Sequence, residues 1–193
     1  MRQQNIPALA LCLGLCLASV ARAQVELTGR ALEDGKPVAN AVVWLDAPNA
    51  PAARKQNRVV MDQRNLTFYP HVLAVRVGTT VDFPNNDRVF HNVFSFRNGK
   101  RFDLGLYPVG AVRQVKFSQA GLSRLFCNIH PNMGAYILAV DTPYFAVTDK
   151  RGAFRMSEVP AGKYTYHAWR AGGADLQGTV VVEAGKALEV SWQ

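Results

Sequence analysis

The stretch Cys127-Asn128-Ile129-His130-Pro131-Asn132-Met133 decides how the central part of this 193-residue chain is interpreted. It places a thiol, an imidazole and a thioether within a few residues of one another. Pro131 resists helix continuation and the following Gly134 favours a turn, so the stretch is expected to be a loop. Apolar residues precede it at 125–126 and follow it at 136–140, which predicts that the loop joins two β-strands.

A second imidazole, His91, begins the segment His91-Asn92-Val93-Phe94-Ser95-Phe96. The β-branched and aromatic content of this segment predicts a strand, entered through the turn-rich Pro84-Asn85-Asn86-Asp87. A thiolate, two imidazoles and a weak axial thioether form the donor set that binds copper for one-electron transfer. The sequence therefore predicts one copper ion, cycling between Cu(I) and Cu(II), with metal ligands as follows: His91, Cys127, His130 and Met133.

Zinc is the main competing metal, because it also accepts Cys and His. Its structural sites favour four Cys or His ligands, whereas the thioether of Met133 favours copper. The chain contains no Cys-x-x-Cys-His signal for haem attachment. Calcium and magnesium prefer oxygen ligands. Copper is therefore the preferred interpretation.

These residues resemble the cupredoxin family, in particular amicyanin and pseudoazurin. The resemblance covers about Arg58 to Asp141 and includes Val77-Gly78-Thr79-Thr80-Val81-Asp82-Phe83-Pro84, His91-Asn92-Val93 and the Cys127 loop. The short Cys-x-x-His-x-x-Met spacing is most similar to amicyanin, of the methylamine-utilisation type. The resemblance implies a Greek-key β-sandwich, a type 1 (blue) copper site near one end, and single-electron transfer between redox protein partners.

The same resemblance implies roles for residues around the ligands. Asn92 would tie the His91 strand to the Cys127 loop through its side chain, as outer contacts of metal ligands do. His130 would be the ligand nearest to solvent, and its edge would be the port for electrons. The port would be ringed by Ile129, Pro131 and Asn132.

Residues 1–23 have the features of a secretory signal peptide. Arg2 precedes an apolar stretch from Ile6 to Val20, and Ala21-Arg22-Ala23 ends it before Gln24. This stretch is short for a membrane span and no later segment approaches about 20 apolar residues, so we expect a periplasmic protein without a transmembrane span in the mature chain. After cleavage Cys127 is the only cysteine, which excludes an intramolecular disulfide.

The flanks of the predicted copper domain, residues 24–50 and 143–193, contain short strand patterns separated by turns. They resemble the two ends of a carboxypeptidase-regulatory-like domain, a small transthyretin-like sandwich. Residues 24–50 are too few to bury a core alone. We therefore expect an all-β chain in which a cupredoxin domain, residues 54–141, is inserted in a second sandwich. The alternative is one cupredoxin with an N-terminal hairpin and a separate C-terminal sandwich.

The full chain has 22 basic and 14 acidic residues and a net charge of +8, and loss of Arg2 and Arg22 with the signal peptide leaves +6. This excess favours acidic redox partners, and an ordinary solvated basic surface is the alternative. Nucleic acid is not an expected partner, because no recognisable binding module is present. Electron transfer is the leading function. Copper storage or delivery, or a structural or adhesive sandwich with an incidental metal site, are the alternatives. An enzyme is not expected, because the sequence offers no second histidine cluster for a substrate-binding metal.

Overall fold

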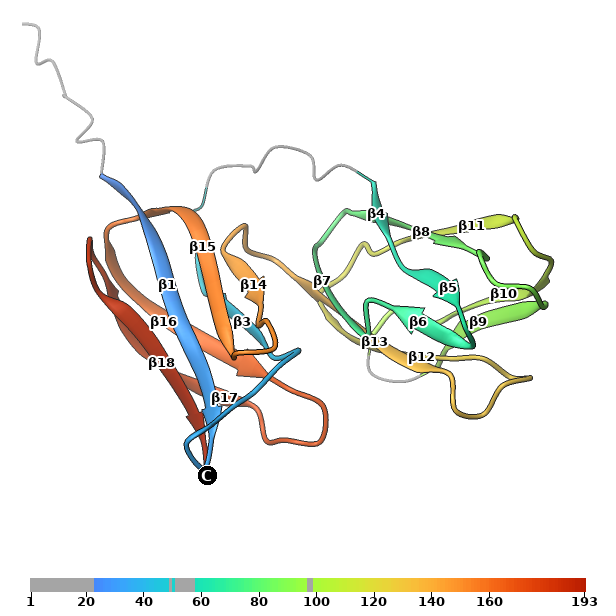
Figure 1. Cartoon of the computed structure of the whole chain (residues 1–193). Helices are drawn as coiled ribbons and strands as arrows, with labels where there is room; N and C mark the ends of the chain where they lie inside the picture. Colours follow the sequence, from blue (N-terminus) through green and yellow to red (C-terminus); the bar gives the residue numbers. More distant parts are fainter. Residues whose placement is uncertain (1–22, 49, 51–57, 97–98) are drawn as a thin grey trace, which may run out of the picture.

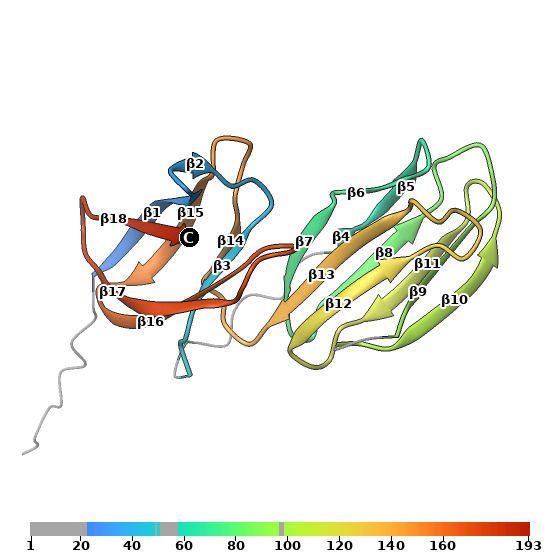
Figure 2. The same cartoon turned by 90° about the horizontal axis from the view of Figure 1, so that it is seen from below.

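The computed structural model describes residues 23–48, 50, 58–96 and 99–193. The predicted signal peptide, residues 1–23, lies outside them except for Ala23. All regular structure in the described residues is β-strand, which confirms the all-β prediction. The strands form two lobes that lie side by side (Figures 1 and 2).

The first lobe contains a five-stranded sheet, a three-stranded sheet and a small hairpin. The five strands, in spatial order, are β10 (Phe102–Tyr107), β9 (His91–Ser95), β12 (Gly121–Phe126), β13 (Gly134–Val140) and β7 (Val72–Arg76). The second sheet has the order β11 (Val112–Lys116), β8 (Thr80–Pro84) and β4 (Val59–Val60). The hairpin pairs β5 (Asp62–Arg64) with β6 (Thr67–Tyr69).

The second lobe also contains two sheets. One has the order β15 (Ala153–Pro160), β1 (Gln24–Glu33) and β18 (Ala187–Trp192), with the short β2 (Lys36–Pro37) paired to β1. The other has the order β14 (Phe145–Val147), β3 (Val42–Leu45), β16 (Gly162–Trp169) and β17 (Leu176–Val182). Both sheets thus combine strands that precede the first lobe in the sequence with strands that follow it.

Alternation along the strands builds the core of the first lobe. On β13, Ala135, Ile137 and Ala139 point into this core, together with Val93 of β9 and Leu125 of β12. Leu138 and Val140 of β13 are nevertheless also buried. Strand β13 is therefore apolar on both faces, as expected for a strand that is covered on both sides.

The second lobe covers the outer face of β13 and β7. A separate apolar cluster joins the lobes, and its buried members are Val42, Val72, Ala74, Leu138, Val140 and Trp169. The ring of Trp169 on β16 contacts Tyr136 on β13, with 5.1 Å between ring centroids. The two lobes are thus in packed contact through the outer face of the five-stranded sheet.

The loop between β12 and β13 lies at the end of the first lobe that is remote from the second lobe (Figures 1 and 2). This end therefore remains uncovered by the second lobe. Within the described residues, no helix is long and apolar enough to cross a membrane.

Candidate metal centre

The Cys127 loop is a tight connection between two antiparallel strands. Strand β12 ends at Phe126 and β13 begins at Gly134, and these two residues are paired in the sheet. The loop is closed by hydrogen bonds from Cys127 N–H to the Met133 carbonyl, 3.3 Å, and from Met133 N–H to the His130 carbonyl, 2.9 Å. The predicted loop between two strands is confirmed.

The side chains of the loop divide between core and surface. Cys127 is 5% exposed and Met133 is 1% exposed, and both belong to the core of the first lobe. His130, which comes between these two residues in the sequence, is half-buried. The loop thus holds its two sulfur-bearing side chains in the core and carries an imidazole to the edge of the surface.

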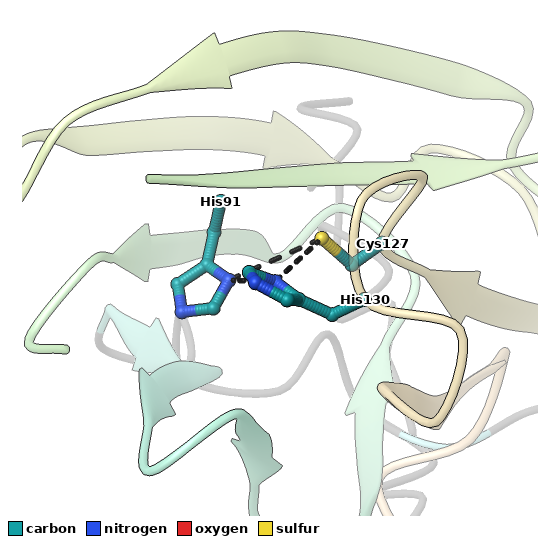
Figure 3. Close-up of side chains that lie close together, drawn as sticks. All are labelled: His91, Cys127 and His130. Carbon is teal, nitrogen blue, oxygen red and sulfur yellow. Dashed lines mark hydrogen bonds between the residues drawn. The ribbon is translucent and has the colours of Figure 1, made fainter. Parts of the chain in front are cut away.

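His91 comes to this loop from a neighbouring strand. It is the first residue of β9, which pairs with β12 through Phe94 and Phe126, and its side chain is fully buried. The Nδ1 atom of His91 lies 3.0 Å from Nδ1 of His130 and 4.0 Å from Sγ of Cys127 (Figure 3). The Sγ of Cys127 lies 3.6 Å from Nδ1 of His130. Three donor atoms, one from strand β9 and two from the Cys127 loop, therefore converge on one point.

The triangle of donor atoms has the size that a metal ion requires. The point equidistant from His91 Nδ1, His130 Nδ1 and Cys127 Sγ is about 2.1 Å from each, compared with metal–nitrogen and metal–thiolate bonds of about 2.0–2.3 Å. Among the described His, Cys, Asp and Glu residues, the group found able to hold a metal is His91, Cys127 and His130. The donor set therefore fits a thiolate-binding transition metal.

Asp87 determines which nitrogen of His91 faces the cluster. Its Oδ2 lies 3.0 Å from His91 Nε2, on the other side of the ring from Nδ1. Burial raises the pKa of Asp87, but hydrogen bonds from the Leu66 N–H, the His91 ring and the Arg88 N–H lower it to about 2 overall. The ionised carboxylate is placed to accept a proton from Nε2, and Nδ1 is the ring nitrogen that faces Cys127 and His130.

The sequence interpretation missed Asp87. The only signal was a carboxylate four residues before His91, in a segment assigned solely to a turn. Backbone groups hold the carboxylate in place, because Oδ2 accepts from Leu66 N–H at 2.7 Å and Oδ1 from Arg88 N–H at 2.8 Å. Leu66 belongs to the β5–β6 hairpin, which is distant in sequence from β9. This contact could not be read from local spacing.

Tyr107 is a second residue that the sequence interpretation missed. It is directly opposite His91 in the β9–β10 pairing and is fully buried. Its hydroxyl donates to the Phe83 carbonyl at 3.2 Å and accepts from the amide of the buried Gln63. Burial raises the pKa of Tyr107 to about 12, although the Gln63 hydrogen bond and Arg113 oppose this rise. The neutral phenol of Tyr107 thus links β10 to β8 and β5, next to His91 in the β9–β10 pairing.

The contact expected for Asn92 differs from the one observed. Its side-chain amide donates to Asp103 Oδ1 on β10 at 2.7 Å. Side chains alternate along a strand, so Asn92 points to the sheet face opposite to His91 and Val93. The expected tie from Asn92 to the Cys127 loop is therefore not among the hydrogen bonds of the described residues.

The residues expected around the electron port are on the surface. Ile129, Pro131 and Asn132 are exposed at the apex of the loop, next to the half-buried His130. The other two described histidines are elsewhere: His71 packs edge-on against Tyr136, and His167 pairs with Asp46 at 2.9 Å.

Comparison with known proteins gives partial matches. A family model described as polysaccharide lyase family 4, domain II, matches residues 139–190, which is mainly the second lobe. This family is not the carboxypeptidase-regulatory-like domain that the sequence predicted. None of the comparisons supports that predicted domain. No curated protein matches the chain.

Among solved structures, part of this chain is similar to cupredoxins and to a copper-containing reductase. A purple cupredoxin from Nitrosopumilus maritimus is 24% identical, with a TM-score of 0.39, over 44% of this chain and 100% of that one. Amicyanin from Paracoccus versutus is 20% identical, with a TM-score of 0.40, over 51% of this chain and 97% of that one. A copper-containing nitrite reductase from Thermus scotoductus SA-01 is 26% identical, with a TM-score of 0.43, over 51% of this chain, which spans only 25% of that protein.

Proposed function

We propose that this protein is a periplasmic type 1 copper protein that carries single electrons between redox proteins. The observation that carries the proposal is the convergence of His91 Nδ1, His130 Nδ1 and Cys127 Sγ within 3.0–4.0 Å of one another. Two imidazoles and one thiolate in a trigonal arrangement are the donors of a blue-copper site. A bound copper ion would supply the change between Cu(I) and Cu(II).

The protein would hold this ion in a fixed environment. His91 is buried and is oriented by Asp87, and Cys127 and Met133 are in the packed core. Met133 would be the weak axial donor, because it is buried in the same loop as Cys127 and His130. Ligands fixed by strands and core packing have little freedom to rearrange when the metal changes oxidation state, which favours rapid electron transfer.

Electrons would enter and leave at the half-buried edge of His130. Ile129, Pro131 and Asn132 surround it, and the second lobe packs at a different part of the first lobe (Figure 1). A partner could therefore approach the loop without displacing the second lobe. A basic chain would favour acidic partners. The proposed role is that of a carrier and not of an enzyme.

We further infer that the copper domain, residues 54–141, is inserted in a sandwich made of residues 24–50 and 143–193. The support is the pairing of β1 with β15 and β18, and of β3 with β14 and β16. Limited proteolysis between the lobes near Ala53 tests this arrangement. The terminal fragments should stay associated after cleavage, whereas their separation would contradict the insertion.

The visible absorption spectrum tests the proposed function. The mature protein loaded with Cu(II) should show an intense thiolate-to-copper band that ascorbate bleaches. Cys127→Ser should lack the band, while the control Met61→Leu, which changes a buried core methionine that was not predicted to be a ligand, should keep it. Weak absorption by the loaded protein, or a preference for zinc in a competition titration, would contradict the electron-carrier proposal.

A further inference from the structure

The turn between β5 and β6 contains an unusual residue. Arg64 pairs with Thr67, so the turn consists of Asn65 and Leu66, whose φ angles are +52° and +56°. Two positive φ angles define the type I′ turn, which usually has Asn or Gly at the first position and Gly at the second. Asn65 suits its position, but a bulky residue such as Leu66 is disfavoured at positive φ.

Neither packing nor hydrogen bonding explains a leucine at this position. The side chain of Leu66 is 51% exposed, so the core gains little from it. The backbone N–H of Leu66 donates to Asp87, but glycine has the same N–H. Leu66 thus has an unfavourable backbone conformation and an aliphatic side chain that is exposed to solvent. Such a conflict between local preference and structure is typical of functional sites.

Leu66 is at the same end of the first lobe as the metal centre. Its N–H reaches Asp87 Oδ2, the oxygen that lies 3.0 Å from His91 Nε2. Val89 and Phe90, which link Asp87 to His91 in the chain, are exposed, as is Ile129 beside His130. Exposed apolar side chains are therefore present on the hairpin, on the approach to β9 and on the Cys127 loop.

The charges exposed at this end are positive. On the hairpin, the guanidinium of Arg64 stacks over the exposed ring of Tyr69 at 4.2 Å. Arg88 is exposed next to Asp87. The two carboxylates here, Asp62 and Asp87, are largely buried and accept hydrogen bonds from the protein. Asp62 Oδ2 also lies 3.9 Å from Nε of Arg64, whose side chain is nevertheless 49% exposed. Arginine and tyrosine are also the residue types enriched in the energetic centres of protein interfaces.

We propose that the exposed residues of the β5–β6 hairpin, Arg64, Leu66 and Tyr69, form a docking surface for an acidic redox protein. This inference rests on the proposed electron-carrier function. Leu66 would enter an apolar contact on the partner while Arg64 faces a carboxylate. The docked partner would lie beside the apolar residues that surround His130. One electron would pass between the partner's redox centre and copper, so that one centre is oxidised as the other is reduced.

The test compares a protein donor with a small donor in stopped-flow reduction of the Cu(II) protein. The protein donor is a reduced, acidic plant-type [2Fe–2S] ferredoxin, and the small donor is hexacyanoferrate(II). Leu66→Gly should lower the second-order rate constant with ferredoxin at least fivefold and leave that with hexacyanoferrate(II) within twofold. Arg64→Gln should lower the ferredoxin rate and weaken its dependence on ionic strength.

Two controls separate docking from folding. Leu66→Gly removes the unfavourable side chain at positive φ, so the melting temperature of the metal-free protein should be unchanged or higher. Val181→Asn changes a 50% exposed aliphatic residue on β17 of the second lobe and should not alter the ferredoxin rate. A structural role for Leu66 would instead appear as a lower melting temperature with unchanged kinetics, and would overturn the proposal.

The kinetic results also distinguish failure of the docking surface from failure of the proposed electron-carrier function. Unchanged ferredoxin rates in both hairpin variants would overturn the docking surface but leave the carrier function intact, provided that hexacyanoferrate(II) still reduces the copper. If neither donor reduces the wild-type protein, the proposed function itself fails. Self-association of the wild type that Leu66→Gly abolishes in analytical ultracentrifugation would identify a second copy as the occupant and contradict an acidic partner.

Discussion

The carboxylate of Asp87 lies 3.0 Å from Nε2 of His91, while Nδ1 of the same ring faces Sγ of Cys127 at 4.0 Å. One buried imidazole thus connects a carboxylate to the cluster of donor atoms. The carboxylate is itself held by the Leu66 N–H of the β5–β6 hairpin. The geometry of the candidate metal centre therefore depends on a hairpin that supplies none of the predicted ligands.

Asp87→Asn should weaken copper binding. The neutral amide loses the charge-assisted hydrogen bond that keeps Nδ1 of His91 free, and such losses reduce metal affinity by about 10–100-fold. Competition with a chelator of known affinity measures the effect. Asp62→Asn is the matched control, because this nearby carboxylate contacts Gln63, Asn86 and Arg64 and not a histidine. Equal affinities in wild type and Asp87→Asn would refute the orienting role.

Met133→Leu should raise the reduction potential of the copper site. Loss of the axial thioether removes an electron donor, which destabilises Cu(II) relative to Cu(I). The two side chains have similar volumes, so the metal-free protein should lose less than about 1.5 kcal/mol of stability. Protein-film voltammetry gives the potential. Met61→Leu, at a fully buried core methionine outside the Cys127 loop, should leave the potential unchanged.

Tyr107 should make the stability of the metal-free protein fall in alkali. Burial raises its pKa from 10.0 to about 12, so the folded state keeps a proton that the unfolded state loses. Its contribution is therefore present below pH 10 and is lost as the pH rises through about 12, with a size on the order of 2 kcal/mol. Urea unfolding of wild type and Tyr107→Phe measures it.

The difference in stability between wild type and Tyr107→Phe should depend on pH in a defined direction. Tyr107→Phe should be less stable than wild type at neutral pH, because it leaves the buried Gln63 amide without one acceptor. The difference should shrink between pH 10 and pH 12. Tyr69→Phe, at an exposed ring, should follow the wild-type curve. A constant difference across this range would contradict the burial argument.

Trp169→Ala should destabilise the protein without removing the copper chromophore. Trp169 is buried between the lobes against Tyr136, and removal of a buried aromatic ring costs about 3–5 kcal/mol. Urea unfolding of the metal-free protein measures the loss. The exposed control Leu106→Ala should change stability by about 0.5 kcal/mol or less. A loss below about 1 kcal/mol for Trp169→Ala would show that the contact between the lobes contributes little.

Short-range features were predictable because they depend on neighbouring residues. The loop from Cys127 to Met133 follows from the turn-forming Pro131 and Gly134 between two apolar runs, and the strand at His91 follows from its β-branched and aromatic residues. The donor types were also evident, because the thiol, imidazole and thioether are close in sequence. The roles of these residues as copper ligands stay predictions.

Beyond the approach of His91 to the Cys127 loop and the association of the two flanks, contacts between distant segments were not predictable. The orientation of Asn92 toward Asp103 follows from the pairing of β9 with β10, and the burial of both faces of β13 follows from the position of the second lobe. The bond from Leu66 to Asp87 requires a particular placement of the β5–β6 hairpin. Local spacing contains no information on such contacts.

The sequence by itself determined that this is an all-β chain with a thiolate, two imidazoles and a thioether in positions suited to one metal, because strand alternation and turn chemistry act over a few residues. The approach of His91 to Cys127 was predicted from the sequence, whereas the tertiary structure alone decided that Asp87 lies against the His91 ring and that Leu66 is exposed beside Asp87. The physical reason is that strand pairing and side-chain packing between distant segments set these positions.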